Sequence, residues 1–83
     1  MAKTPNADPL DQERLLKLGR HLQSLRKRAG LSVRAVAETV GVTHAAINKV
    51  EAGMNCHGVS TLIRLAYTYG VKPSEIFTPL DDE

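Results

Sequence analysis

The chain has 83 residues, of which 42% are apolar and only three are aromatic, and it carries a formal net charge of +2. A chain of this size builds one modest core, so a second catalytic lobe is not expected. The sequence has no signal-peptide pattern and no run of roughly twenty apolar residues, and Cys56 is its single cysteine. These observations argue against a secreted or membrane-spanning protein and favour the cytoplasm.

The positive charge is concentrated in the middle of the sequence. Residues 14–51 hold eight Lys or Arg and two Glu, a balance of +6, whereas residues 1–13 and 52–83 each carry −2. A basic centre between acidic flanks is typical of a surface that contacts nucleic-acid phosphates. A solvated helix face is the alternative interpretation of the charge pattern alone.

The first predicted element is an amphipathic helix. Residues 1–9 are polar, contain Pro5 and Pro9, and are expected to be flexible. Asp11 is expected to cap a helix that ends at Gly30. Its apolar residues recur at spacings of three and four: Leu15, Leu18, Leu22, Leu25 and Ala29.

The segment from Gly30 to Gly53, GLSVRAVAETVGVTHAAINKVEAG, predicts two short helices joined by a tight turn. Ser32 and Thr43 are each placed to cap a helix N-terminus, so two separate helices are expected rather than one long helix. Gly41 lies between them, where the chain must turn through a left-handed conformation. Ala37 lies where the helices should cross, and its small side chain permits close approach.

The remaining residues predict two further helices. The loop over residues 52–58 is expected to be exposed. A helix over residues 59–69 has its inner face at Leu62, Leu65, Ala66 and Tyr69 and ends at Gly70. A short fifth helix is expected over residues 72–77, with Pro73 at its start. Because strand patterns are absent, the predicted class is all-α. The domain is expected over residues 10–78, with an acidic tail over residues 79–83. The chain from Thr78 onward is expected to fray.

With five helices in this order, residues 18–77 resemble the Cro and phage-repressor type helix-turn-helix family, often called XRE. The motifs that carry the resemblance are LRKRAGLS, the Ala37 to Gly41 spacing, GVTHAAINKVEAG and TLIRLAYTYGVKPSEIF. The resemblance implies a compact five-helix, lambda-repressor-like bundle with the helix-turn-helix at helices two and three. It also implies a transcription regulator that binds double-stranded DNA as a two-fold homodimer, with the third helix in the major groove. In size the chain is similar to restriction-modification controller proteins and mobile-element regulators.

The resemblance assigns roles by position. The expected base-contacting residues are His44, Ala45, Asn48 and Lys49, since the N-terminal part of a recognition helix faces base edges. Arg34 and Thr43 are expected near phosphates, and Asn55 and His57 are weaker phosphate candidates. Exposed residues without a DNA partner are the alternative interpretation, above all for Ala45.

The chain departs from the family pattern at two places. Many relatives have Gln where this chain has Val33 and His44, and many have Lys or Arg in the loop that here reads MNCH. Phosphate anchoring is therefore expected to shift to Arg34 and the first helix. Arg26 and Glu51 match family positions that pair across helices one and three, so they are expected to form a structural ion pair.

Partner surfaces are predicted from the C-terminal apolar residues. Ile76, Phe77 and Leu80 are expected to form the dimer interface, with core packing as the alternative, above all for Phe77. Such a dimer would bind half-sites roughly 34 Å apart on a near-palindromic operator. RNA polymerase is a further candidate partner. With no ligand domain in view, regulation is expected to depend on protein concentration and cooperative DNA occupancy. The main alternative function is an antitoxin or protein-interaction module that autoregulates its operon.

Metal and enzyme functions fit the sequence poorly. His21, His44, Cys56 and His57 match no common zinc spacing, so neither a metal nor a cofactor is expected. No nucleophile, base and orienting acid occur in a recognisable arrangement, and no phosphate-binding glycine loop is present. A redox role for Cys56 is left open.

Overall fold

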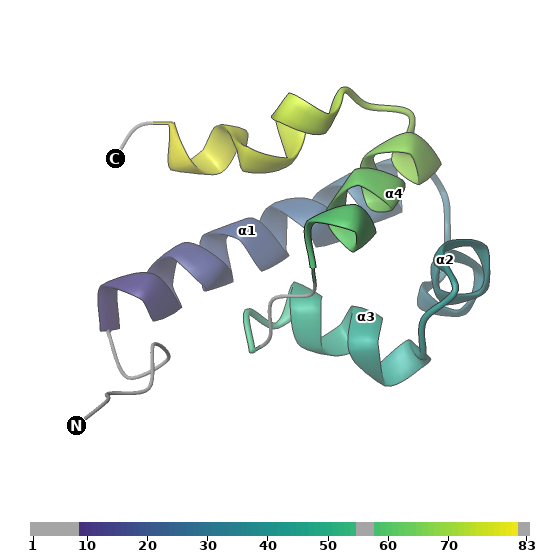
Figure 1. The fold of residues 1–83 in the computed structure, drawn as a ribbon, viewed down its shortest axis with the longest axis horizontal. Coiled ribbons are helices and arrows are strands. Elements are labelled where there is room, and N and C mark those ends of the chain that lie inside the picture. Colours follow the sequence, from purple (N-terminus) through teal and green to yellow (C-terminus); the bar gives the residue numbers. More distant parts are fainter. Residues whose placement is uncertain (1–8, 55–57, 82–83) are drawn as a thin grey trace.

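The computed structural model describes residues 9–54 and 58–81, and in these residues every regular element is a helix (Figure 1). The elements are α1 (Pro9–Arg28), α2 (Val33–Val40), α3 (His44–Glu51), α4 (Val59–Tyr69) and the 3₁₀ helix η2 (Pro73–Leu80). The predicted all-α class and the number of helices are confirmed. No helix among the described residues is long and apolar enough to cross a membrane.

The central helix pair forms as the local sequence predicts. The Ser32 hydroxyl accepts a hydrogen bond from the Ala35 N–H at 3.0 Å, and the Thr43 hydroxyl accepts one from the Ala46 N–H at 3.1 Å. Gly41 ends α2 with a φ of 86°, and its N–H donates to the Ala37 carbonyl. Each helix start therefore has a side-chain cap, and the turn between them uses a conformation that glycine adopts at little cost.

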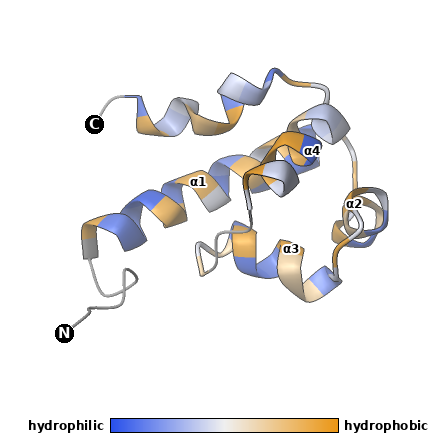
Figure 2. Ribbon diagram, viewed as in Figure 1, coloured by the Kyte–Doolittle hydropathy of each residue, from blue (hydrophilic) through white to orange (hydrophobic). Residues whose placement is uncertain are grey.

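The core lies where the five helices face one another. α1 packs on α3 and η2, α2 packs on α3 and α4, and α4 packs on η2. Along α1 and α3 hydrophilic and hydrophobic residues alternate from turn to turn, as expected for helices with one buried face (Figure 2). The buried apolar residues include Leu22, Val36, Ala37, Ile47, Leu65, Ala66 and Ile76. Ala37 is only 1% exposed, in accord with its expected place at a close helix contact.

Two glycines allow α1 to touch the end of α3. A Cβ on Gly19 would lie 2.5 Å from the carbonyl oxygens of both Val50 and Glu51. A Cβ on Gly53 would lie 2.7 Å from the Leu16 Cα, and Gly53 also has a positive φ of 72°. The last turn of α3 is thus held in backbone contact with α1, which fixes how α3 projects from the domain.

The first helix starts earlier than the sequence predicted. It begins at Pro9 rather than after Asp11, because proline at a first helical position loses no helical hydrogen bond. Asp11 consequently lies in the first turn, where its carboxylate is favoured by the helix dipole and pairs with Arg14 at 3.3 Å.

The last helix continues further than predicted. Residues 78–80, expected to fray, belong to η2, which ends at Leu80. Pro79 has no N–H to donate to the Glu75 carbonyl, as an α-helix would require. That carbonyl instead accepts from the Thr78 hydroxyl at 3.0 Å and lies 2.8 Å from the His21 Nε2. Because a carbonyl can only accept, His21 donates this bond and ties η2 to α1.

Candidate nucleic-acid interface

The third helix divides into a buried face and an exposed face. Its buried residues are Ala46, Ile47, Val50 and Glu51. The exposed residues are those expected to read bases, namely His44, Ala45, Asn48 and Lys49. These side chains offer an imidazole, a methyl group, an amide and an ammonium, which together can donate to, accept from and pack against base edges. The structure thus leaves a mostly polar surface on α3 that stays exposed among the described residues.

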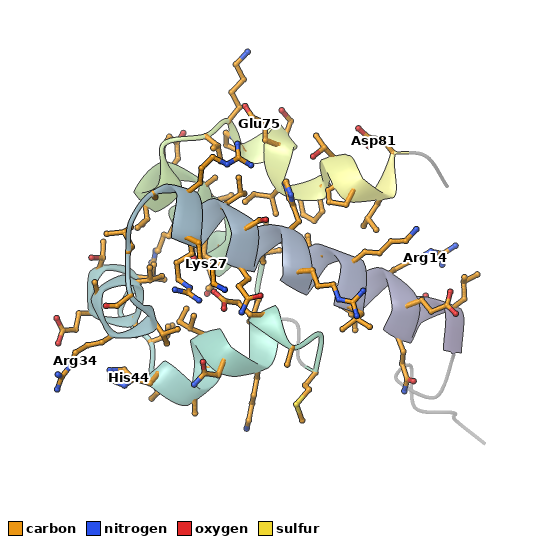
Figure 3. All side chains as sticks on the ribbon, turned by 180° about the vertical axis from the view of Figure 1, so that it is seen from behind. Arg14, Lys27, Arg34, His44, Glu75 and Asp81 are labelled. Atoms are coloured by element: carbon orange, nitrogen blue, oxygen red, sulfur yellow. The ribbon has the colours of Figure 1, made fainter. Side chains whose placement is uncertain are left out.

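The expected phosphate-binding residues flank this surface. Arg34 is exposed in the first turn of α2, and it lies with His44 at the same end of the molecule (Figure 3). Thr43 is exposed, and although its oxygen caps α3, its hydroxyl hydrogen can still donate to a phosphate. Asn55 and His57, the weaker candidates, lie outside the described residues, as does Cys56.

A buried ion pair supports α3 from behind. The Arg26 Nε donates to the Glu51 Oε2 at 2.7 Å and the Arg26 Nη2 donates to the Glu51 Oε1 at 3.1 Å, which makes the pair bidentate. A third donor, the Arg26 Nη1, lies 3.0 Å from the Leu31 carbonyl in the loop before α2. The hydrogen bond to Glu51 raises the pKa of Arg26 above its ordinary value, so the guanidinium stays charged. Arg26 thereby joins α1, the α1–α2 loop and α3.

Tyr69 of α4 lies near this pair. Burial raises the pKa of the Tyr69 phenol to about 12, and the charge on Glu51 acts in the same direction. The phenol therefore stays neutral at any physiological pH. A neutral hydroxyl beside the ion pair adds no competing charge behind the recognition helix.

The predicted dimer residues occupy different environments. Ile76 is 1% exposed and belongs to the core, so it offers almost no surface to a partner subunit. A 3₁₀ helix has three residues per turn, which places Ile76 and its neighbour Phe77 on different faces. Phe77 is 44% exposed and Leu80 is partly buried.

The sequence analysis missed an exposed apolar stripe on α4. Val59, Ile63 and Tyr67 are 72%, 41% and 72% exposed, and they follow one another at intervals of four residues on one helix face. A hollow of about 40 Å³ beside them is lined by α4 and η2 residues that include Phe77. We call Val59, Ile63, Tyr67 and Phe77 the α4–η2 face. The four-residue spacing was the available signal, although it sits beside the stronger pattern of the buried face.

The described residues hold no group of three or more His, Cys, Asp or Glu that could bind a metal ion. His21, one of the histidines considered above, is bound to the Glu75 carbonyl and lies 3.4 Å from the Thr78 hydroxyl. Its place in the molecule is that of a link between α1 and η2.

A capped helix pair, with a polar outer surface on the second helix and a basic first helix behind it, defines a helix-turn-helix domain. The family model described as "Helix-turn-helix domain" matches residues 17–76. The chain therefore belongs to the helix-turn-helix family of DNA-binding transcription regulators, in the Cro and phage-repressor group that the sequence motifs predict.

The relatives that match this segment are transcriptional regulators. The chain is 40% identical to the HTH-type transcriptional regulator PuuR of Escherichia coli K12 and, to the same extent, to that of Shigella flexneri. Each match extends over 60 residues, which are 72% of this chain. The matched segment is 32% of each of those proteins, so the chain spans about a third of the length of these curated relatives.

Solved structures show the same fold. The restriction-modification controller protein C.AhdI from Aeromonas hydrophila superposes with a TM-score of 0.72 at 30% identity, over 76% of this chain and 96% of that one. An HTH_3 family transcriptional regulator from Vibrio cholerae gives a TM-score of 0.73 at 29% identity, over 84% of this chain and 40% of that one.

Proposed function

We propose that this protein acts in the cytoplasm as a sequence-specific regulator of transcription, with α3 in the major groove of a near-palindromic operator. The observation that carries the proposal is the α3 surface, where every residue expected to read bases is exposed while the rest of the helix is buried. Lys49 can donate to guanine O6 and N7, His44 can donate to or accept from a base edge, and Ala45 can meet a thymine methyl group.

Phosphate binding is proposed for the residues around α3. Arg34 and Thr43 lie at the starts of α2 and α3, where exposed N–H groups also favour anions. Such contacts position the protein without reading sequence. Asn55 and His57 stay as weaker candidates for the same role.

We propose that two copies bind together through the α4–η2 face. The four residues of the α4–η2 face are large, apolar and at least 41% exposed, and an exposed apolar cluster of this kind marks an interaction surface. An α3 of eight residues reaches only a few base pairs, so a second copy is needed for a site long enough to be selective. Phe77 keeps its proposed place in the dimer interface, and Leu80, which is partly buried, lies at the edge of that interface. Ile76 lies beneath the interface, in the core.

The dimer is tested by Ile63→Lys. Placing a charge at the centre of the α4–η2 face should convert a dimer at tens of micromolar into a monomer, as measured by sedimentation, because the ammonium would be buried without a partner. Met54→Lys, at another exposed apolar residue, is the matched control and should leave the dimer intact. A wild-type protein that stays monomeric both alone and on DNA would contradict the proposal.

The roles in DNA binding are tested by Lys49→Ala and Arg34→Ala on a selected operator and on random DNA. Losing a base contact should cost about 1–3 kcal/mol on the operator and little on random DNA, so Lys49→Ala relaxes specificity. Losing a phosphate contact should weaken binding to the operator and to random DNA alike, so Arg34→Ala lowers both affinities without changing their ratio. It should also reduce the slope of log affinity against log salt concentration by about 0.9. Equal losses on both DNAs from Lys49→Ala would show that Lys49 reads no base.

A further inference from the structure

Two cations on α1, Arg20 and Lys27, are exposed on the surface of the domain. Among the basic residues of this helix, Arg26 is paired with Glu51, and Arg14 is paired with Asp11. Arg20 and Lys27 are exposed, and neither has an ion-pair partner within residues 9–54 and 58–81. Lys27 lies in the last turn of α1, where the helix dipole favours a cation. Arg20 lies in the middle of α1, where the helix dipole gives a cation no such stabilisation.

The two cations share one face of α1. They are seven residues apart, which in an α-helix separates them by about 10 Å along the axis and only about 20° around it. Gly19 lies on the side of α1 that faces α3. Helix geometry places Arg20 and Lys27 about 80–100° around the helix axis from Gly19. Arg28 is turned about 180° from Gly19, to the opposite side. The acid on the face of the two cations, Glu13, precedes Arg20 by about 10 Å, too far for an ion pair.

This face lies across the domain from the α4–η2 face. Figure 1 shows α4 in front of α1, and Figure 3, from behind, shows α1 in front of α4. α1 packs on α3 and η2, whereas α4 packs on α2 and η2, so the two helices bound the core from different sides. In a dimer formed through the α4–η2 face, Arg20 and Lys27 are therefore turned away from the two-fold axis, toward the outer ends of the DNA site.

We propose that Arg20 and Lys27 bind the phosphate backbone of the DNA that flanks each half-site on its outer side. The inference rests on the proposed function. Gly19 brings α1 into backbone contact with the last turn of α3, so the backbone of the next residue, the exposed Arg20, lies close to that turn. A separation of about 10 Å suits two different phosphates of one strand rather than a single one. The residues thus lengthen the bound site without adding sequence preference.

The test compares two duplexes that carry the same selected operator. One duplex ends at the outer edges of the half-sites, and the other extends about ten base pairs further on each side, roughly one helical turn. The variant Arg20→Gln/Lys27→Gln removes the two cations. The matched control, Arg28→Gln/Lys72→Gln, lowers the net charge equally at two other exposed positions, Arg28 on the opposite side of α1 from α3 and Lys72 outside α1.

Wild-type protein should bind the long duplex at least tenfold more tightly than the short one at 0.15 M salt, since roughly two phosphate contacts per subunit are gained. The Arg20→Gln/Lys27→Gln variant should lose this difference and keep its affinity for the short duplex, while the control variant keeps the difference. Wild-type binding that is equal on both duplexes, or a control that loses as much as the test variant, would overturn the inference. Failure of the wild type to bind either duplex would instead overturn the proposed function.

Discussion

Substituting Gly19 by alanine should destabilise the domain by roughly 3 kcal/mol or more, which corresponds to a fall in Tm of more than about 12 °C for a domain of this size. Alanine in place of glycine in the interior of a helix would by itself stabilise it by about 1 kcal/mol. Here the added Cβ would lie 2.5 Å from two carbonyl oxygens of α3, and backbone atoms cannot rotate aside as a side chain can. Steric conflict should therefore outweigh helix propensity.

The control for Gly19→Ala is Ser24→Ala, at an exposed position of the same helix. It adds no contact with α3 and should stabilise the protein by up to about 0.5 kcal/mol. Both variants are compared by thermal and chemical denaturation. If Gly19→Ala melted at or above the wild-type temperature, α1 and α3 could not be in the close contact described above.

Breaking the Arg26–Glu51 pair should have the second large effect. Glu51→Ala should lower the free energy of unfolding by about 3–5 kcal/mol, because the buried guanidinium loses two hydrogen bonds and its counter-charge. Arg26 would keep its bond to the Leu31 carbonyl. Arg26→Ala should cost more than Glu51→Ala, since it leaves both a buried carboxylate and that carbonyl without a donor.

A double-mutant cycle measures this coupling. The double variant Arg26→Ala/Glu51→Ala should be less destabilised than the sum of the two single variants, because no uncompensated charge is left behind. Additive losses, or a Glu51→Ala variant that unfolds like the wild type, would refute the structural role of the pair.

The features that the sequence predicted well depend on neighbouring residues. Ser32 and Thr43 cap the helices that directly follow them, and Gly41 provides the turn between them, so their roles follow from local geometry. The Arg26–Glu51 contact spans 25 positions and was predicted only through the family resemblance. The base-reading candidates on α3 were likewise assigned through the family resemblance, and they lie opposite the buried residues of that helix.

The features that the sequence did not predict depend on tertiary packing. Gly19 has no local signature, because its importance comes from the α3 carbonyls that approach it. The bond from His21 to the Glu75 carbonyl of η2 joins residues more than fifty positions apart, which no local pattern reveals. The buried position of Ile76 did not follow from the sequence, because adjacent apolar residues in a short helix do not reveal which of them faces the core.

The central claim, that α3 reads a DNA sequence, is tested most directly by selecting bound duplexes from a random pool. The wild-type protein should enrich a near-palindromic motif whose half-site centres lie one helical turn, roughly 34 Å, apart. The variant His44→Ala/Asn48→Ala/Lys49→Ala, altered only at exposed α3 residues, should fold normally and lose that motif while it keeps weak, salt-sensitive binding to all DNA. Enrichment of the same motif by both proteins, or of no motif by the wild type, would contradict the account.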